Sequence, residues 1–151
     1  MRRLAAIEFL QDVLARGCVV LDLAGEIEAE YHRYLRPRGQ PGIGDRVYLE
    51  VLNSAPGRIE RVHLPKDQAG EYKDFSNAAE LASFDASDRK FAALGRRERV
   101  PVANATDSDW LVHCAALALN MISVHFVCGC DRGAWFTQPA TSIDATAVTP
   151  R

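Results

Sequence analysis

The chain has 151 residues, of which 48% are hydrophobic and 25% charged, and its 18 Lys and Arg against 20 Asp and Glu give a net charge of -2. These values are typical of an ordinary globular domain, and they exclude collagen, a coiled coil and a disordered chain. The near-neutral charge excludes an avid binder of duplex DNA, but it is compatible with an enzyme that touches nucleic acid transiently. At this length we expect one domain.

No segment is suited to membrane insertion or to secretion. Apolar runs such as Cys114–Leu119 are far shorter than the roughly 20 residues that a membrane span needs. The apolar positions near the start are interrupted by Glu8 and Asp12, so a secretory signal is not expected. We therefore expect a cytoplasmic protein that has no membrane partner.

The four cysteines, at positions 18, 114, 128 and 130, do not follow the paired spacing of a zinc finger. A zinc site that combines His125 with Cys128 and Cys130 is the less favoured alternative. We expect reduced thiols, packed in the core or placed at strand ends.

Helical and β-rich segments alternate along the chain, which predicts an α/β domain with a mainly parallel sheet. In the first half we expect helices over residues 1–16, 24–35 and 45–52, and strands over 18–22 and 58–64. Residues 65–84 are polar, with one short helix at 77–82. In the second half we expect helices over 87–94 and 109–121, strands over 100–104 and 123–128, and a tail. The helix over 109–121 is expected to bury one face, formed by Trp110, Cys114, Leu117 and Met121.

Two carboxylates occupy positions that helical periodicity places among apolar residues. Glu30 follows Leu23 and Ile27 at helical spacing, which puts it on the apolar stripe of its helix. Asp88 opens the inward face of the helix over 87–94. A carboxylate on such a face costs free energy unless a cation or a hydrogen-bond donor meets it. The structural alternative is that Glu30 reaches water at the stripe border and that Asp88 is stabilised by the helix dipole.

Two further carboxylates, Asp107 and Asp109, follow the strand expected over residues 100–104. Either one is suited to cap the next helix. The carboxyl ends of strands are also where open α/β sheets bind ligands, so we expect the acids to cluster at one sheet edge. Repelling carboxylates are tolerated around a hard divalent cation, and Mg²⁺ takes one or two of them directly. Such an ion activates water and holds a phosphate oxygen during phosphodiester hydrolysis.

Five short motifs together carry a family resemblance. They are A-E-Y-H-R-Y-L at 29–35, G-I-G-D at 42–45, F-D-A-S-D-R-K-F at 84–91, N-A-T-D-S-D-W at 104–110 and the closing S-V-H-F-V-C. In this order they resemble the bacterial PIN-domain family over residues 1–130, with 131–151 as a tail. The resemblance implies a three-layer α/β/α sandwich with a mainly parallel central sheet. It also implies a Mg²⁺- or Mn²⁺-dependent endoribonuclease, in many relatives the toxin of a toxin–antitoxin pair.

By this resemblance four acids would hold the metal and catalyse hydrolysis: Glu30, Asp88, Asp107 and Asp109. Asp85 would support its turn without binding metal. Single-stranded or structured RNA would contact basic side chains beside the acids through its phosphates: Arg89, Lys90 and Arg33. An antitoxin protein and a second copy of the chain are the protein partners that the resemblance suggests.

The chain departs from the family at its start. The family opens with a central strand that ends in the first metal-binding Asp, whereas here residue 1 already lies in the first helix. Asp22 is not a substitute, because it is expected to cap the helix that follows it. Three explanations stay open. The native start lies upstream of Met1, which we favour; or the protein is a degenerate relative that binds a partner; or residues 141–148 return as the missing strand, with Asp144 in place of the absent acid.

Two classes of function are therefore carried forward. The first is a metal-dependent ribonuclease, and the second is a catalytically degenerate protein-interaction module. A receiver-like phosphoacceptor domain ranks third, because no strand, Asp and helix arrangement with a downstream Lys is apparent in the sequence.

Overall fold

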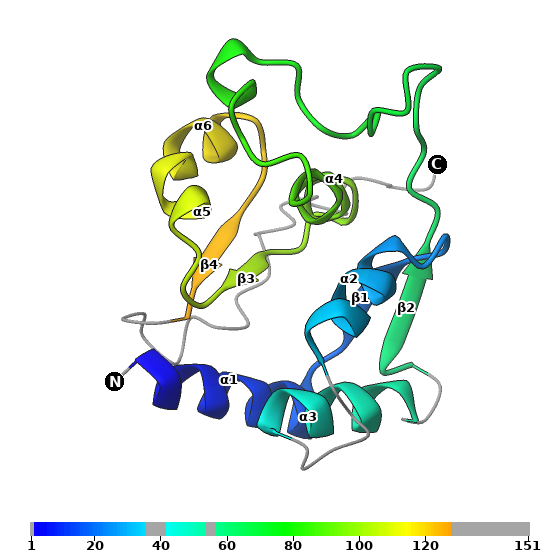
Figure 1. The fold of residues 1–151 in the computed structure, drawn as a ribbon, viewed down its shortest axis with the longest axis vertical. Helices are drawn as coiled ribbons and strands as arrows, with labels where there is room; N and C mark the ends of the chain where they lie inside the picture. The colour runs from blue at the N-terminus through cyan, green and yellow to red at the C-terminus, as the bar shows by residue number, and fades with distance from the viewer. Residues whose placement is uncertain (1, 36–41, 54–56, 128–151) are drawn as a thin grey trace, which may run out of the picture.

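The computed structural model describes residues 2–35, 42–53 and 57–127, which form a mixed α/β fold with short parallel strands (Figure 1). The helices are α1 (Arg2–Arg16), α2 (Glu26–Tyr34), α3 (Ile43–Leu52), the 3-10 turn η1 (Ala79–Leu81), α4 (Arg89–Glu98), α5 (Ser108–Val112) and α6 (Cys114–Leu119). The strands are β1 (Val19–Asp22), β2 (Ile59–Val62), β3 (Val102–Asn104) and β4 (Val124–Phe126). Each element expected from the sequence in these ranges is present, with bounds that differ by a few residues. No helix of the described part is long and apolar enough to cross a membrane.

The described strands form two separate two-stranded sheets. β1 runs parallel to β2, with Val19 opposite Ile59, and β3 runs parallel to β4, with Val102 opposite Val124. The parallel pairing is as predicted. One continuous central sheet is not formed by the described residues.

Each sheet has an inner edge that no described strand pairs. The Val19 N–H donates to the Arg58 carbonyl at 2.9 Å, so β1 turns the peptide groups of Val19 toward β2. Because peptide groups alternate along a strand, those of Val20 point away from β2. By the same alternation the peptide groups of Ala103 point away from β4, and the Ala103 side chain is exposed.

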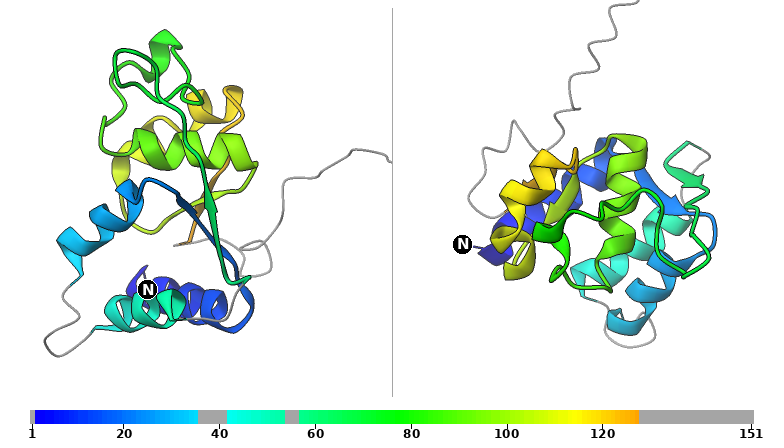
Figure 2. Two further views of the ribbon diagram at one scale, coloured as in Figure 1. Left: turned by 90° about the vertical axis from the view of Figure 1, so that its right-hand side faces the viewer. Right: turned by 90° about the horizontal axis from the view of Figure 1, so that it is seen from above.

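Helix α4 contacts both sheets and supplies both hydrophobic clusters. Leu94 packs with Leu21 and Ile27, which are exposed by only 2% and 1%. The other cluster gathers α4 residues with aromatic and aliphatic side chains from the second half of the chain: Phe75, Leu81, Phe84, Ala92, Ala93, Trp110, Leu117 and Ile122. A methyl group on Gly95 would lie 2.9 Å from Val102 Cγ2, so α4 approaches β3 closely. Helices α1 and α3 pack together on the side of the strands opposite to α4 (Figure 2).

The predicted helix over 109–121 is divided into α5 and α6, and one of its predicted core residues is wrong. Trp110 and Leu117 are buried, but Met121 is 71% exposed. Met121 adopts a left-handed conformation, with φ of 62°, which reverses the chain after α6. The reversal turns the next residue, Ile122, into the core in its place.

Asp22 caps α2, as the sequence predicts. Its carboxylate is 2% exposed and accepts hydrogen bonds from the Glu26 and Ile27 N–H groups, both at 2.8 Å. The first N–H groups of a helix have no partner within the helix, and an unpaired buried donor costs about 1–3 kcal/mol. These two hydrogen bonds also fix the start of α2 against the end of β1.

We expect Asp22→Ala to lower the free energy of unfolding by about 2–3 kcal/mol, because two buried donors lose their acceptor. Asp22→Asn keeps one acceptor oxygen and should lose about half as much. Urea denaturation measures both, with the exposed Glu60→Ala in β2 as the control for loss of a carboxylate. If Asp22→Ala lowers the free energy of unfolding by less than about 0.5 kcal/mol, water accepts the hydrogen bonds in place of the Asp22 carboxylate, and the prediction is wrong.

Candidate functional site

Glu30 lies on α2 beside a cation. The stripe predicted around it forms only in part, because Ile27 is 1% exposed whereas Leu23 is 62% exposed. Helix α2 begins only at Glu26, after Gly25 with φ of 79°, so Leu23 is outside the helix. The Glu30 side chain is 15% exposed, and its Oε2 lies 3.1 Å from Lys90 Nζ.

Lys90, which the family resemblance places at the substrate, is instead the buried partner of Glu30. Its side chain is 9% exposed, and the ammonium donates to Glu30 and, at 2.5 Å, to the Ser87 carbonyl. A signal was present, since Lys90 precedes the core residue Leu94 by one helical turn. Lys90 and Glu30 share a surface hollow of about 320 Å³, whose lining comes from α2 and the start of α4: Glu26, Ala29, Glu30, Arg33, Ser87 and Lys90.

Three of the predicted acids gather with Asp85 where the chain enters α4 and α5. Asp107 caps α5, since its Oδ1 accepts the Asp109 N–H at 2.9 Å. Asp109 Oδ2 in turn accepts the Asp85 N–H at 2.9 Å, which ties the two turns together. Asp85 Oδ1 accepts the N–H and the hydroxyl of Ser87, both at 2.7 Å, so Asp85 supports its turn as predicted.

Asp88 is the one acid of this group whose charge the fold disfavours. It stands at the N-terminus of α4, yet its side chain caps no backbone N–H of the helix. Burial, followed by the charges of Asp107 and Asp85, raises the pKa of Asp88 to about 6, although the Trp110 side chain donates a hydrogen bond to it. Trp110 is held by edge-to-face packing on Phe84, with ring centroids 4.9 Å apart.

This raised pKa predicts a pH dependence of stability without added cation. Because the pKa is about 6 in the folded state and about 4 in the unfolded chain, the folded state binds the proton more tightly. The proton on Asp88 therefore stabilises the folded state fully below about pH 4, and this stabilisation is lost as the pH rises through 6. We expect Asp88→Asn to be more stable than wild type by about 1 kcal/mol at pH 8, a value reduced by solvent screening, and to show no gain at pH 4. Urea midpoints in EDTA at both pH values test this, and an equal difference at both would contradict it.

Two of the three basic residues assigned to substrate are engaged within the fold. Arg89 donates to the Ala82 carbonyl at 3.1 Å, pairs with Glu71 at 3.2 Å and lies over the Phe75 ring at 5.2 Å. Lys90 is occupied by Glu30, as described above. Arg33 is different, because its side chain is 71% exposed and reaches Glu30 only at 3.4 Å. Arg33 is therefore the cation of this set that presents its charge to solvent.

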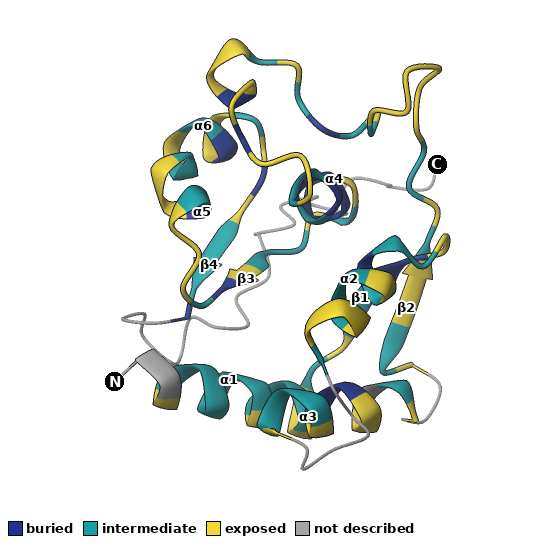
Figure 3. Cartoon of the chain, viewed as in Figure 1, coloured by how far each residue is buried: buried dark blue, intermediate teal, exposed yellow. Residues whose placement is uncertain are grey.

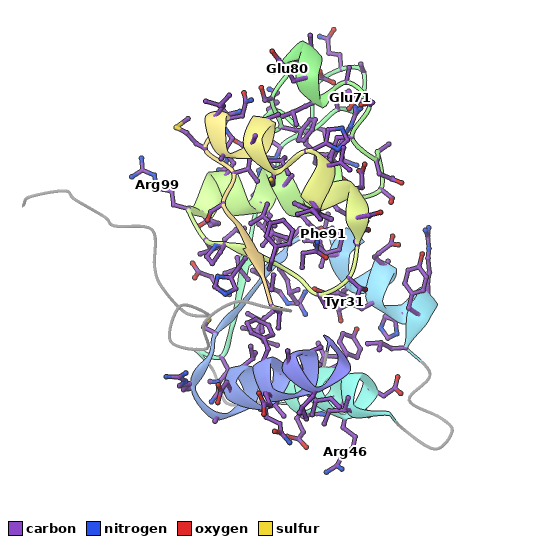
Figure 4. All side chains as sticks on the ribbon, turned by 90° about the vertical axis from the view of Figure 1, so that its left-hand side faces the viewer. Tyr31, Arg46, Glu71, Glu80, Phe91 and Arg99 are labelled. Atoms are coloured by element: carbon purple, nitrogen blue, oxygen red, sulfur yellow. The ribbon has the colours of Figure 1, made fainter. Side chains whose placement is uncertain are left out.

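An aromatic contact between Tyr31 and Phe91 joins α2 to α4. Tyr31 and Phe91 face each other with centroids 6.1 Å apart, whereas Arg46, Glu80 and Arg99 point outward at the periphery (Figure 4). Burial raises the pKa of Tyr31. This contact holds Glu30 and Lys90, one residue away on each helix, at a fixed separation.

The donor chemistry suits a hard cation, although the four predicted ligands do not meet at one point. Within the described residues, no three His, Cys, Asp or Glu side chains are close enough together to hold a metal ion. Mg²⁺ is commonly bound by one or two carboxylates and several waters, so the acids around Asp88 fit it without Glu30. The alternative zinc ligands Cys128 and Cys130, the tail over 131–151 and Asp144 lie outside the described residues.

Comparison with known proteins adds no assignment. No protein-family model matches the chain, and neither do curated proteins or solved structures.

Proposed function

We propose that the protein is a Mg²⁺- or Mn²⁺-dependent endoribonuclease of the PIN type, with single-stranded or structured RNA as substrate. The observation that carries the proposal is the gathering of acids where the chain enters α4 and α5. Burial and the neighbouring carboxylates of this group raise the pKa of Asp88. Perturbed carboxyl groups are concentrated at functional sites, and a divalent cation relieves such repulsion. A role as the toxin of a toxin–antitoxin pair follows from the same resemblance.

The residues divide into cation-binding and phosphate-binding groups. Asp88, with Asp107 or Asp109, would hold the cation, which when bound supplies an activated water and neutralises charge on the phosphate. The Trp110 side chain favours the charged form of Asp88, the form that would bind the cation. Arg33, at the rim of the hollow, would bind an RNA phosphate.

We further propose that the two sheets belong to one three-layer α/β/α sandwich with an open central position. The inner edges at Val20 and Ala103, which no strand among the described residues pairs, support this, as does α4, which contacts both β1 and β3. On the other side, α1 presents apolar residues, among them Ile7 and Leu10, that are only partly buried. A strand between β1 and β3 would pair both edges and cover these side chains.

The experiment is cleavage of labelled single-stranded and hairpin RNA with millimolar Mg²⁺ or Mn²⁺, with EDTA as the control. We expect cleavage only with cation, and a melting temperature that rises with cation, equivalent to about 1.4 kcal/mol at ten times the Kd. Absence of both effects would overturn the proposal. Cation-dependent stabilisation without cleavage would retain the cation site and remove the nuclease activity.

A second candidate, a protein-interaction module without catalytic activity, is favoured by one observation. Lys90 forms an ion pair with Glu30, so this predicted metal ligand already has a cation beside it. This candidate predicts no cleavage, no stabilisation by Mn²⁺, and a protein that co-purifies from the native cells.

A further inference from the structure

A serine, a histidine and an aspartate from two separate segments form a connected row of hydrogen bonds. Ser83 follows η1, and its hydroxyl oxygen lies 3.1 Å from Nε2 of His113, the residue between α5 and α6. The other ring nitrogen of His113, Nδ1, lies 3.1 Å from Oδ1 of Asp109, one helical turn earlier. Because Ser83 and His113 are 30 residues apart, their spacing along the chain does not reveal this arrangement.

The surroundings of His113 determine which ring nitrogen carries the proton. Nδ1 lies 2.9 Å from the Asp109 carbonyl oxygen and 3.1 Å from the Asp109 carboxylate, and both of these groups only accept hydrogen bonds. In the neutral ring Nδ1 therefore carries the hydrogen, and Nε2 accepts the hydrogen bond of the Ser83 hydroxyl. A histidine in this state is placed to act as a general base for that hydroxyl.

Packing and hydrogen bonds hold His113 and Asp109 in position. The His113 side chain is 10% exposed, and its ring meets the Phe84 ring edge to face, with centroids 5.5 Å apart. Asp109 uses its second carboxylate oxygen to accept the Asp85 N–H at 2.9 Å. Because each oxygen of Asp109 has a donor, the carboxylate is fixed relative to the His113 ring.

Ser83, in contrast, is open to solvent. Figure 3 shows that the chain from η1 to α4, which includes Ser83, is exposed along most of its length. Ala82 is exposed as well, and together with Leu81 it forms part of the lining of a surface hollow of about 270 Å³. A small substrate can therefore reach the Ser83 hydroxyl without displacing a buried side chain.

We propose that Ser83 is a nucleophile that takes the acyl group from activated esters of short carboxylic acids, with His113 as its general base and Asp109 as a positioning residue. The Ser83 oxygen bonds to the carbonyl carbon and its proton passes to His113 Nε2. The bond to the alcohol oxygen breaks, and the alcohol leaves with that proton. Water then attacks the acyl-serine, gives a proton to Ser83 through His113, and releases the carboxylic acid.

This activity requires no cation and is independent of the proposed ribonuclease. In the ribonuclease the cation would be held by Asp88 with Asp107, which leaves Asp109 to His113. Assays in EDTA therefore test Ser83 alone, and their failure would leave the proposed cation site unaffected.

Release of p-nitrophenolate from p-nitrophenyl acetate in EDTA tests the nucleophile. Ser83→Ala should lower the protein-dependent rate at least tenfold, a lower bound on the roughly 100-fold that a positioned general base contributes. Ser123→Ala removes another exposed serine and is the control, which should react as wild type does. The melting temperature of both variants should stay unchanged, because both side chains are exposed. An equal rate in Ser83→Ala and wild type would overturn the proposal.

Variants of the other two residues distinguish activation of the hydroxyl from a structural link. His113→Gln keeps a polar side chain without a basic nitrogen, and it should lower the rate as much as Ser83→Ala does. Asp109→Asn should also lower the rate, whereas Asp109→Glu keeps the carboxylate and should recover part of it. A structural role predicts the opposite order, because asparagine keeps the shape and the acceptor for the Asp85 N–H. Wild-type rates in His113→Gln, or a higher rate in Asp109→Asn than in Asp109→Glu, would overturn the assignment.

Discussion

Asp88→Asn is expected to lower the rate of cation-dependent RNA cleavage at least about 100-fold, with the fold intact. The amide carries no charge, so it neither repels its acidic neighbours nor holds a divalent cation as a carboxylate does. Its shape is retained, so the hydrogen bond from Trp110 to the side-chain oxygen can persist. Activity should therefore fall while apo stability at neutral pH rises, a combination that simple unfolding cannot produce.

The measurement is single-turnover cleavage in Mn²⁺, together with thermal melting with and without the cation. Asp107→Asn should act in the same direction, whereas Glu80→Gln removes an exposed charge that is not one of the proposed ligands and should cleave as wild type does. Asp88→Asn should also lose the Mn²⁺-dependent gain in melting temperature. Cleavage at the wild-type rate in Asp88→Asn would refute the assignment of this residue.

Cation binding should also depend on pH through the same carboxyl group. The proton must leave Asp88 before a cation binds, and the pKa of Asp88 without cation is about 6. We expect the cation concentration for half-maximal stabilisation to increase as the pH falls from 7 to 5. An unchanged concentration over this range would place the cation away from Asp88.

Lys90→Met is expected to destabilise the protein by about 3 kcal/mol, because it leaves the Glu30 carboxylate without its closest cation. The two side chains are 9% and 15% exposed, so water cannot fully replace the ammonium. For a chain of this length the loss corresponds to a decrease in melting temperature of about 6–12 °C. Methionine keeps about the length of the aliphatic stem, so the substitution removes mainly the charge.

A double-mutant cycle separates the charge from the packing. Lys90→Met combined with Glu30→Gln should recover most of the lost stability, because neither charge then remains buried. Arg33→Met is the matched control: it removes a second cation 3.4 Å from Glu30, but one that is 71% exposed, and should cost less than about 0.5 kcal/mol. Equal losses for Lys90→Met and Arg33→Met would show that burial does not decide the strength of this pair.

Local chemistry in the sequence was sufficient for the secondary structure and for three of the polar roles. Asp22 and Asp85 do what their positions predict, because a carboxylate just before a helix or turn finds backbone N–H groups within a few residues. Asp107 likewise caps α5. These contacts span only a few residues, so no knowledge of the tertiary fold was needed.

The sequence-based predictions of side-chain roles are wrong where a side chain contacts a residue far away in the sequence. Glu30 and Lys90 are 60 residues apart, and the alternation of helices and strands does not show that α2 and α4 are neighbours. Arg89 was assigned to RNA, but it contacts the Ala82 carbonyl and Glu71 in the polar segment ahead of α4. Met121 was assigned to the core because periodicity continues past Leu119, where a positive φ ends the helix.

By itself, the sequence determined the order of helices and strands, which depends on periodicity and capping over one or two helical turns. The alternation of helices and strands also indicated parallel pairing. Of the four acids expected to cluster, Asp88, Asp107 and Asp109 gather where the chain enters α4 and α5, but Glu30 does not. Only the tertiary structure decided that Lys90 neutralises Glu30, that Asp88 is the acid with the raised pKa, and that Ser83 meets His113. The reason is physical: burial and ion pairing depend on which elements pack together, and that packing is set by the whole chain.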